Sequence, residues 1–192
     1  FANFIYFFFY FLTFYGFFNV WTLPPRIVLP VFLVFAFIFW LFKKGKLDTL
    51  AATLPRSWVI LAAAFRVPLE FILWLLFVGE VIPIQMTIEG YNFDGLFVLT
   101  ALPMAYLSYT NRLNNTVAIA WNVIGILFVA TIVIISTLST PSPLRWFMNE
   151  PANTVIGHFP FIWLPCFLVP FAVFLHCLSI TVSYTHLTLP TI

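Results

Sequence analysis

The feature that most constrains this chain is a series of six long apolar segments separated by short polar connections. They are residues 1–18, 27–42, 58–78, 93–109, 117–138 and 158–180. A helix of about 20 apolar residues crosses the ~30 Å hydrocarbon core of a bilayer. Hydrophobic residues make up 63% of the chain and charged residues 7%, whereas soluble domains are about half apolar and a quarter charged. The sequence therefore predicts an all-α, polytopic transmembrane helical bundle with about six spans.

The basic residues are unevenly distributed over the connections, which predicts an orientation. One predicted side of the membrane holds five of them: Lys43, Lys44, Lys46, Arg56 and Arg112. The other side holds only Arg26 and Arg145. Lysine and arginine collect on cytoplasmic loops. We therefore expect both ends of the chain to be cytoplasmic and residues 80–92 to lie outside.

Two charged residues lie inside the third apolar segment. Arg66 lies ten residues after Arg56, about 15 Å along a helix, and Glu70 follows four residues later on the same helix face. An unpaired charge at that depth costs several kcal/mol, so we expect Arg66 and Glu70 to pair and to face other helices. The pair is interpreted either as a structural ion pair or as part of a substrate or proton site.

A second polar cluster is predicted on the outer side. It comprises four candidate ligand-binding residues: Glu89, Asn92, Asp94 and Glu150. One interpretation is structural, with Asn92 or Asp94 capping the next helix and Gly90 supplying a turn. The alternative is a shared site in which the carboxylates of Glu89, Asp94 and Glu150 hold a divalent cation or a cationic ligand.

The sixth apolar segment carries prolines, histidines and both cysteines. Pro160, Pro165 and Pro170 should disturb its outer half, either through helix packing or as an irregular stretch lining a wet cavity. His158 and His176 are about 27 Å apart if helical, so they are expected near opposite surfaces as polar packing residues. Asn122, in the fifth segment, is a candidate for an interhelical hydrogen bond.

The missing motifs narrow the function. The chain has no nucleophile elbow, zinc-protease motif, P-loop or dinucleotide fingerprint. We therefore expect no enzyme, no catalytic residues, no bound metal and no cofactor. The net charge of +2 is small and spread out, which gives no indication of nucleic-acid binding. The expected partners are the lipid bilayer and either a small-molecule ligand or another membrane protein.

Both ends of the chain are unusual. Phe1 begins inside an apolar run, which indicates a gene fragment truncated at its N-terminus. Residues 182–192 resemble a translated sequencing adapter. We therefore predict a single transmembrane domain over residues 1–181, and a non-native tail over residues 182–192 that does not pack on it.

Four stretches together carry a family resemblance: residues 23–26, 65–70, 86–95 and 149–154. They resemble a family of uncharacterised bacterial multi-pass membrane proteins, over residues 16–181. No activity is assigned to that family. The resemblance implies the bacterial cytoplasmic (inner) membrane, and it implies that the regions around Arg66 and Asp94 belong to the family's pattern.

Two hypotheses of function follow from these residues. The first is a small carrier or ligand-binding membrane protein, with Arg66 and Glu70 in a cavity. The second is a structural or accessory subunit of a membrane complex, with no ligand of its own. A cavity that reaches Arg66 favours the first hypothesis, and a solid interior around a saturated Arg66 favours the second.

Overall fold

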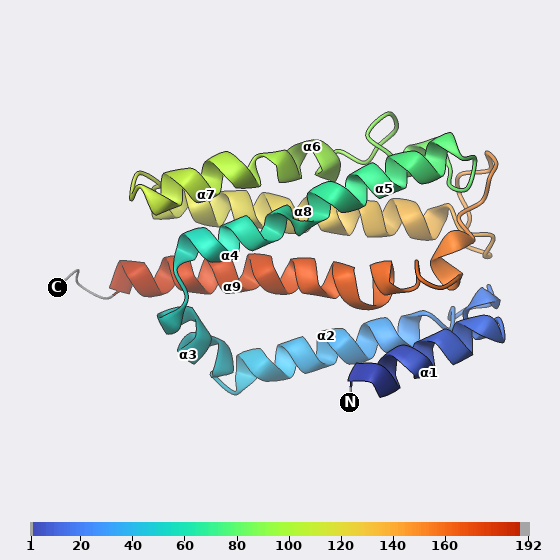
Figure 1. The fold of residues 1–192 in the computed structure, drawn as a ribbon, viewed down its shortest axis with the longest axis horizontal. Helices are drawn as coiled ribbons and strands as arrows, with labels where there is room; N and C mark the ends of the chain where they lie inside the picture. The colour runs from blue at the N-terminus through green and yellow to red at the C-terminus, as the bar shows by residue number, and fades with distance from the viewer. Residues whose placement is uncertain (1, 189–192) are drawn as a thin grey trace.

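The computed structural model describes residues 2–188, with side chains for residue 7 and residues 9–184. All regular structure in this part of the chain is helical. The α-helices are α1 (Ala2–Phe14), α2 (Val28–Lys43), α3 (Lys46–Thr53), α4 (Arg56–Ala62), α5 (Arg66–Val78), α6 (Asp94–Leu99), α7 (Ala101–Tyr109), α8 (Asn115–Leu138) and α9 (Val169–Thr188). Apart from α3, they run roughly along the long axis of one elongated bundle (Figure 1).

Within the part of the chain that the structure describes, three helical segments are long and apolar enough to cross a membrane. They are Arg56–Val78, Asn115–Leu138 and Leu164–Tyr184. Helices α2 and α3 form a fourth candidate if they count as one span, although they are bent by 77°. The prediction of a helical protein with membrane spans is confirmed at this level. The count of six is not, because α1 and the pair α6–α7 are too short for this set within residues 2–188.

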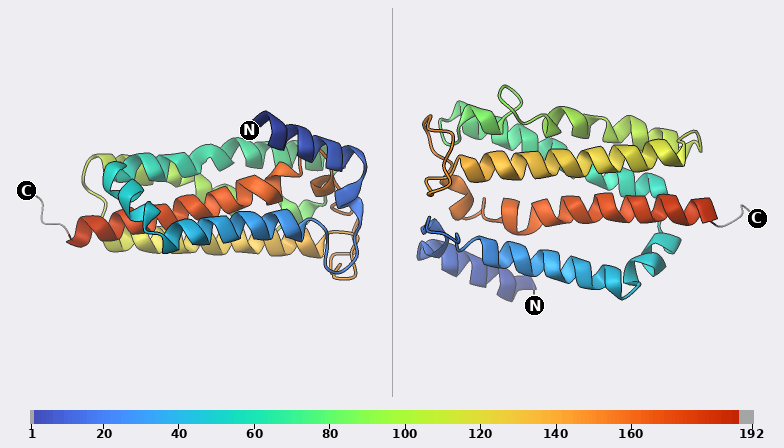
Figure 2. Two further views of the ribbon diagram at one scale, coloured as in Figure 1. Left: turned by 90° about the horizontal axis from the view of Figure 1, so that it is seen from below. Right: turned by 180° about the vertical axis from the view of Figure 1, so that it is seen from behind.

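The connections gather at the two ends of the bundle. Residues 15–27, 79–93 and 139–163 lie at one end, which we call the long-loop end, and residues 44–55 and 110–114 lie at the other, the basic end (Figures 1 and 2). At the long-loop end Asn149 Nδ2 donates to Gln85 Oε1 at 2.8 Å. At the basic end Arg56 donates to the Leu113 carbonyl at 2.9 Å. The grouping matches the two sides that the sequence predicts for these connections.

Helix α9 lies in the middle of the bundle and packs against α8, α4, α3 and α2 (Figure 2). Its inner face buries apolar side chains such as Ala172, Leu175 and Leu178. Helix α2 differs, because none of its residues is fully buried. It joins the bundle through contacts with α3, α9 and the segment before α9. The packing between α2 and the rest is therefore loose, and the cavity described below lies there.

The start of the sixth apolar segment is irregular, as its prolines predict. Residues 158–162 form a bend and turns, and Leu164–Leu168 form a π-helical turn with Pro165 in its first residues. The regular helix begins only at Val169. Proline lacks the amide hydrogen that an α-helix needs, so the backbone here adopts other hydrogen-bonding patterns.

The expectation that residues 182–192 do not pack on the bundle is wrong for their first two members. Helix α9 continues to Thr188, and Val182 and Ser183 are fully buried. Val182 lies four residues after Leu178, on the same helix face, and joins Leu178 in a core cluster with Leu47. Its apolar character therefore suffices for packing, whatever the origin of the segment. The adapter resemblance stays a prediction, and Phe1 and the side chains of residues 185–192 lie outside the described part.

Candidate functional site

Arg66 is buried in the middle of the bundle. It begins α5 after a short 3-10 turn, Ala63–Phe65, and only 5% of its surface is exposed. Its Nη1 donates to both carboxylate oxygens of Asp94, at 2.8 and 3.0 Å. Its Nη2 lies 3.1 Å from His176 Nε2. Its Nε has no hydrogen-bond partner among the described residues.

The expected pairing of Arg66 with Glu70 is wrong, because Asp94 is the partner. The connection after α5 folds back into the bundle, so that Asp94, the first residue of α6, lies beside the first turn of α5. Glu70 accepts a hydrogen bond of 2.7 Å from Asn92 Nδ2. Asn92 is itself buried and also donates to the Met86 carbonyl at 3.2 Å. Two residues of the predicted outer cluster, Asn92 and Asp94, therefore belong to the buried site around Arg66.

A chain of hydrogen bonds extends the site through α8 and α9. An arginine only donates, so His176 Nε2 accepts from Arg66, and the proton of a neutral ring lies on Nδ1. That Nδ1 lies 2.9 Å from Asn122 Oδ1. Asn122 Nδ2 donates to the Ala118 carbonyl at 2.8 Å and to Ser179 Oγ at 2.9 Å. This confirms Asn122 as an interhelical hydrogen-bonding residue, and it makes His176 a neutral partner of Arg66.

His176 belongs to the site although the sequence places it near a surface. The distance expected between His158 and His176 assumes a helix from residue 158, but the helical segment starts at Leu164. His176 is therefore only twelve residues, or about 18 Å, from the start of the helix. Gly125 on α8 makes room for it, because a Cβ at that position would collide with the imidazole ring. A glycine facing a histidine across two helices is not visible as a pattern in one sequence.

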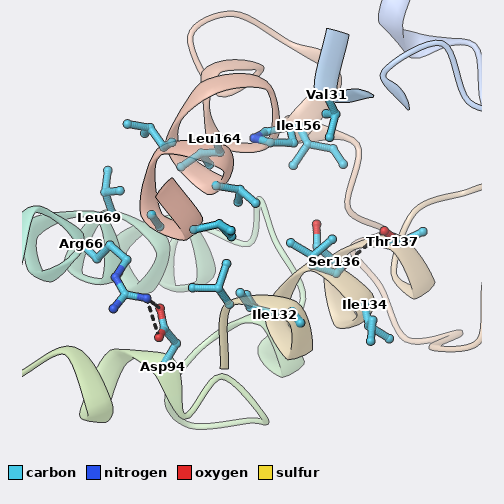
Figure 3. A pocket seen from close by; sticks show the side chains of 18 of the residues that line it. Val31, Arg66, Leu69, Asp94, Ile132, Ile134, Ser136, Thr137, Ile156 and Leu164 are labelled. Atoms are coloured by element: carbon cyan, nitrogen blue, oxygen red, sulfur yellow. Dashed lines mark hydrogen bonds and ion pairs between the residues drawn. The ribbon is translucent and has the colours of Figure 1, made fainter. Parts of the chain in front are cut away.

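A cavity of ≈640 Å³ opens beside Arg66. Its wall is formed by α2, α5, α8, the π-helical turn and α9, together with Met86, Asp94 and Ile156 (Figure 3). Arg66, Glu70 and Asp94 are the charged residues among its lining, and Ser136 and Thr137 supply hydroxyls at another part of the wall. Nearly all of the other lining residues are apolar, such as Val31, Leu69 and Ile132. The irregular stretch before α9 lines this cavity through Leu164, Pro165 and Leu168.

The shared outer site expected of Glu89, Asp94 and Glu150 is not assembled. Glu89 accepts a hydrogen bond of 2.9 Å from Trp74 Nε1, and Glu150 pairs with Arg145 at 2.9 Å. The hydrogen bond from Arg145 lowers the pKa of Glu150 below its usual range. In the part of the chain that the structure describes, no three His, Cys, Asp or Glu side chains are grouped to hold a metal ion. The three carboxylates therefore serve three separate places.

The capping interpretation of Asn92 and Asp94 is also wrong. The first turn of α6 has no side-chain cap, since Asn92 contacts Glu70 and Asp94 contacts Arg66. Gly90 permits a close approach of two backbones, because a Cβ there would collide with the Ile84 carbonyl oxygen. This approach lets residues 79–93 fold inward and deliver Asn92 and Asp94 to the interior.

Comparison of the chain with protein-family models, curated proteins and solved structures finds no match. The resemblance to a bacterial membrane family therefore stays a prediction. The site consists of Arg66, Glu70, Asn92, Asp94 and His176, next to an apolar cavity. The function proposed below is therefore argued from the chemistry of these residues and of the cavity.

Proposed function

We propose that the protein is a small carrier or ligand-binding membrane protein whose ligand occupies the cavity between α2, α5, α8 and α9. The observation that carries this proposal is that Arg66, Glu70 and Asp94 line a cavity of ≈640 Å³ that is otherwise almost entirely apolar. Ligand pockets are typically apolar cavities of this size with a few convergent polar groups.

The placement of the charges favours a ligand over a purely structural role. Ionisable side chains inside a membrane are costly, and those that face an internal cavity commonly mark a ligand or ion pathway. A structural ion pair gains most when packing seals it on all sides. Arg66 Nε has no hydrogen-bond partner among the described residues, so the site is not fully satisfied, and both Arg66 and Glu70 border the cavity. Glu70 accepts only one hydrogen bond there, on Oε2, which leaves Oε1 for a ligand.

The proposal includes a membrane topology of six crossings in a bacterial cytoplasmic membrane, with both ends cytoplasmic. In it α1 and the pair α6–α7 cross as short or broken segments. It is supported by the alternation of connections between the two ends of the bundle (Figure 1). It is also supported by the distribution of basic residues, since five of them lie at or next to the basic end and lysine and arginine collect on cytoplasmic loops.

Single cysteines at Lys44 and Glu89, in a background without Cys166 and Cys177, test this topology. Both positions are exposed. An impermeant thiol reagent on whole cells should label position 89 and spare position 44. Labelling of position 44 alone would reverse the orientation and overturn the proposed topology.

A second candidate function, a structural or accessory subunit of a membrane complex, is favoured by one observation. Both terminal nitrogens of Arg66 already have partners, Asp94 and His176. In this role the site would only lock α5, α6 and α9 together. The partner would be another membrane protein, and the cavity would hold lipid or nothing.

A cavity-filling variant distinguishes the two functions. Ala172 is buried on α9 and lines the cavity, so Ala172→Leu should occupy part of it. Ala120 is exposed on α8 and does not line it, so Ala120→Leu is the matched control. A panel of octyl-chain amphiphiles should raise the melting temperature of the wild type and of Ala120→Leu in lipid nanodiscs, because a ligand stabilises the native state. Ala172→Leu should lose that response. No response of the wild type to any amphiphile would contradict the carrier proposal.

A further inference from the structure

The charges that line the cavity do not balance. Arg66 carries one positive charge, whereas Asp94 and Glu70 can each carry a negative one. His176 accepts a hydrogen bond from Arg66 and is therefore neutral. With both carboxylates ionised, the polar end of the cavity has one unbalanced negative charge. An unbalanced charge in apolar surroundings is strongly unfavourable, so one further positive charge should be present.

The free hydrogen-bonding groups show where that charge belongs. Asp94 is engaged through both oxygens by Arg66. The carboxylate of Glu70 receives a single hydrogen bond among the described residues, on Oε2 from Asn92, and Glu70 borders the cavity. Its Oε1 therefore remains as an acceptor. Arg66 Nε, one helical turn away, is a fully buried donor without a partner among the described residues, so Glu70 Oε1 is the group that a ligand can reach.

Building on the proposed function, we propose that the cavity takes an amphiphilic organic cation, with a primary ammonium group at Glu70 and an alkyl chain among the apolar lining. An ammonium group donates to Glu70 Oε1 and supplies the missing charge. The chain extends past Leu69 and Ile132, which carry no charge to oppose it (Figure 3).

The same charge balance applies to the empty cavity. Without a cation, a proton on Glu70 neutralises the site. When the ammonium group binds, that proton leaves Glu70 for solvent, and the carboxylate pairs with the ammonium, which keeps its own protons. Among the described lining residues, two other titratable groups face Glu70: Arg66 on its own helix and Asp94 on α6. His176 on α9 contacts Arg66 and lies beyond it in the same chain of hydrogen bonds. Helix α2 and the π-helical turn contribute no titratable group to the lining. Binding therefore exchanges one proton for one organic cation.

Octylammonium and octanol, which have the same chain and differ in the charged head, test this inference in nanodiscs of zwitterionic lipid. Calorimetry in two buffers of different ionisation enthalpy gives both the affinity and the number of protons released. Octylammonium should bind at least about tenfold more tightly than octanol, because a charged hydrogen bond is lost with the alcohol. Its binding should release close to one proton, and octanol binding should release none.

Glu70→Gln should abolish the preference for the ammonium and the release of the proton. Glu89→Gln should leave both unchanged, because Glu89 lies at the long-loop end, where Trp74 donates to it. If Glu70→Gln does not fold, Glu70→Asp keeps the charge with a shorter side chain, and it should retain proton release with weaker binding. Unchanged selectivity in Glu70→Gln, or equal binding of octylammonium and octanol by the wild type, would overturn the inference.

Two further outcomes separate this inference from the proposed function. If octanol or octanoate binds the wild type at least as tightly as octylammonium and is excluded by Ala172→Leu, the cavity binds ligands but the cation inference fails. If sodium ions alone release the proton and prevent octylammonium from binding, the site serves an inorganic cation, and the inference also fails. Failure of every amphiphile to bind overturns the proposed function itself.

Discussion

The described part of the chain contains two arginine–carboxylate pairs with nearly the same separation and very different surroundings. Arg66 and Asp94 approach to 2.8 Å, with side chains 6% and 4% exposed. Arg145 and Glu150 approach to 2.9 Å, with side chains 17% and 73% exposed. The distance between the charged atoms therefore does not distinguish the pairs. What distinguishes them is the cost of removing one partner, which is large where water cannot replace it and small where it can.

The two pairs also differ in what they connect. Arg66 and Asp94 join α5 to α6, and Arg66 continues through His176 to α9. Arg145 and Glu150 lie five residues apart in one connection, where Arg145 also donates to the Phe147 and Asn149 carbonyls. Loss of the inner pair should therefore affect the whole bundle. Loss of the outer pair should affect one loop.

The largest effect is expected from Asp94→Asn. The substitution keeps the size of the side chain and removes the charge that faces Arg66, which leaves the guanidinium buried without its ion-pair partner. We expect a loss of about 3 kcal/mol in the free energy of unfolding, measured by denaturant titration in mixed micelles. An unchanged stability would show that the interior around Arg66 is as well hydrated as a surface.

The double variant Asp94→Asn with Arg66→Gln is the control for this prediction. Removal of both charges leaves no stranded ion, so the double variant should recover most of the stability that Asp94→Asn loses. If the two losses simply add, the residues do not act as a pair.

An intermediate effect is expected from Gly125→Ala, which leaves every charge in place. The added Cβ collides with the imidazole of His176, so the ring must move and its hydrogen bond to Arg66 weakens. We expect a loss of about 1–3 kcal/mol, as for other overpacked interiors.

Gly79→Ala is the matched control, because a Cβ at Gly79 meets ordinary neighbours at 3.4 Å or more. It should change the stability by less than about 0.5 kcal/mol. Gly125→Ala and His176→Ala should also be non-additive when combined, since the smaller side chain removes the collision. Equal effects of the two glycine substitutions would contradict tight packing around His176.

The helical class and the burial of Arg66 were predictable from the sequence, because the length of an apolar run and a charge inside it are local properties. The sequence also identified Arg66 and Glu70 as buried charged residues of one segment. It identified Asn92 and Asp94 as candidate ligand-binding residues, although in a separate outer cluster. Asn122 was predicted as an interhelical contact and forms one. These residues stand out because a polar group in an apolar segment needs a partner.

The partners themselves were not predictable from local spacing. Asp94 reaches Arg66 because residues 79–93 fold inward around Gly90, and His176 reaches it because the prolines delay the start of α9. Both facts depend on contacts between segments far apart in the chain. The cavity likewise results from the loose packing of α2, whose uniformly apolar sequence resembles that of any other span.

The smallest effect is expected from Glu150→Gln at the long-loop end. Its carboxylate is exposed and pairs with Arg145 in water, so the substitution should shift the melting temperature by less than about 1 °C at neutral pH. The hydrogen bond from Arg145 lowers the pKa of Glu150 in the folded protein. Whatever stability the pair contributes is therefore present above the unfolded pKa of about 4.3 and is lost as the pH falls through the lower folded value. Melting curves of the wild type and Glu150→Gln should thus converge in acid, and also in high salt, which screens exposed charges. A loss from Glu150→Gln as large as that from Asp94→Asn would show that exposure does not separate the two pairs.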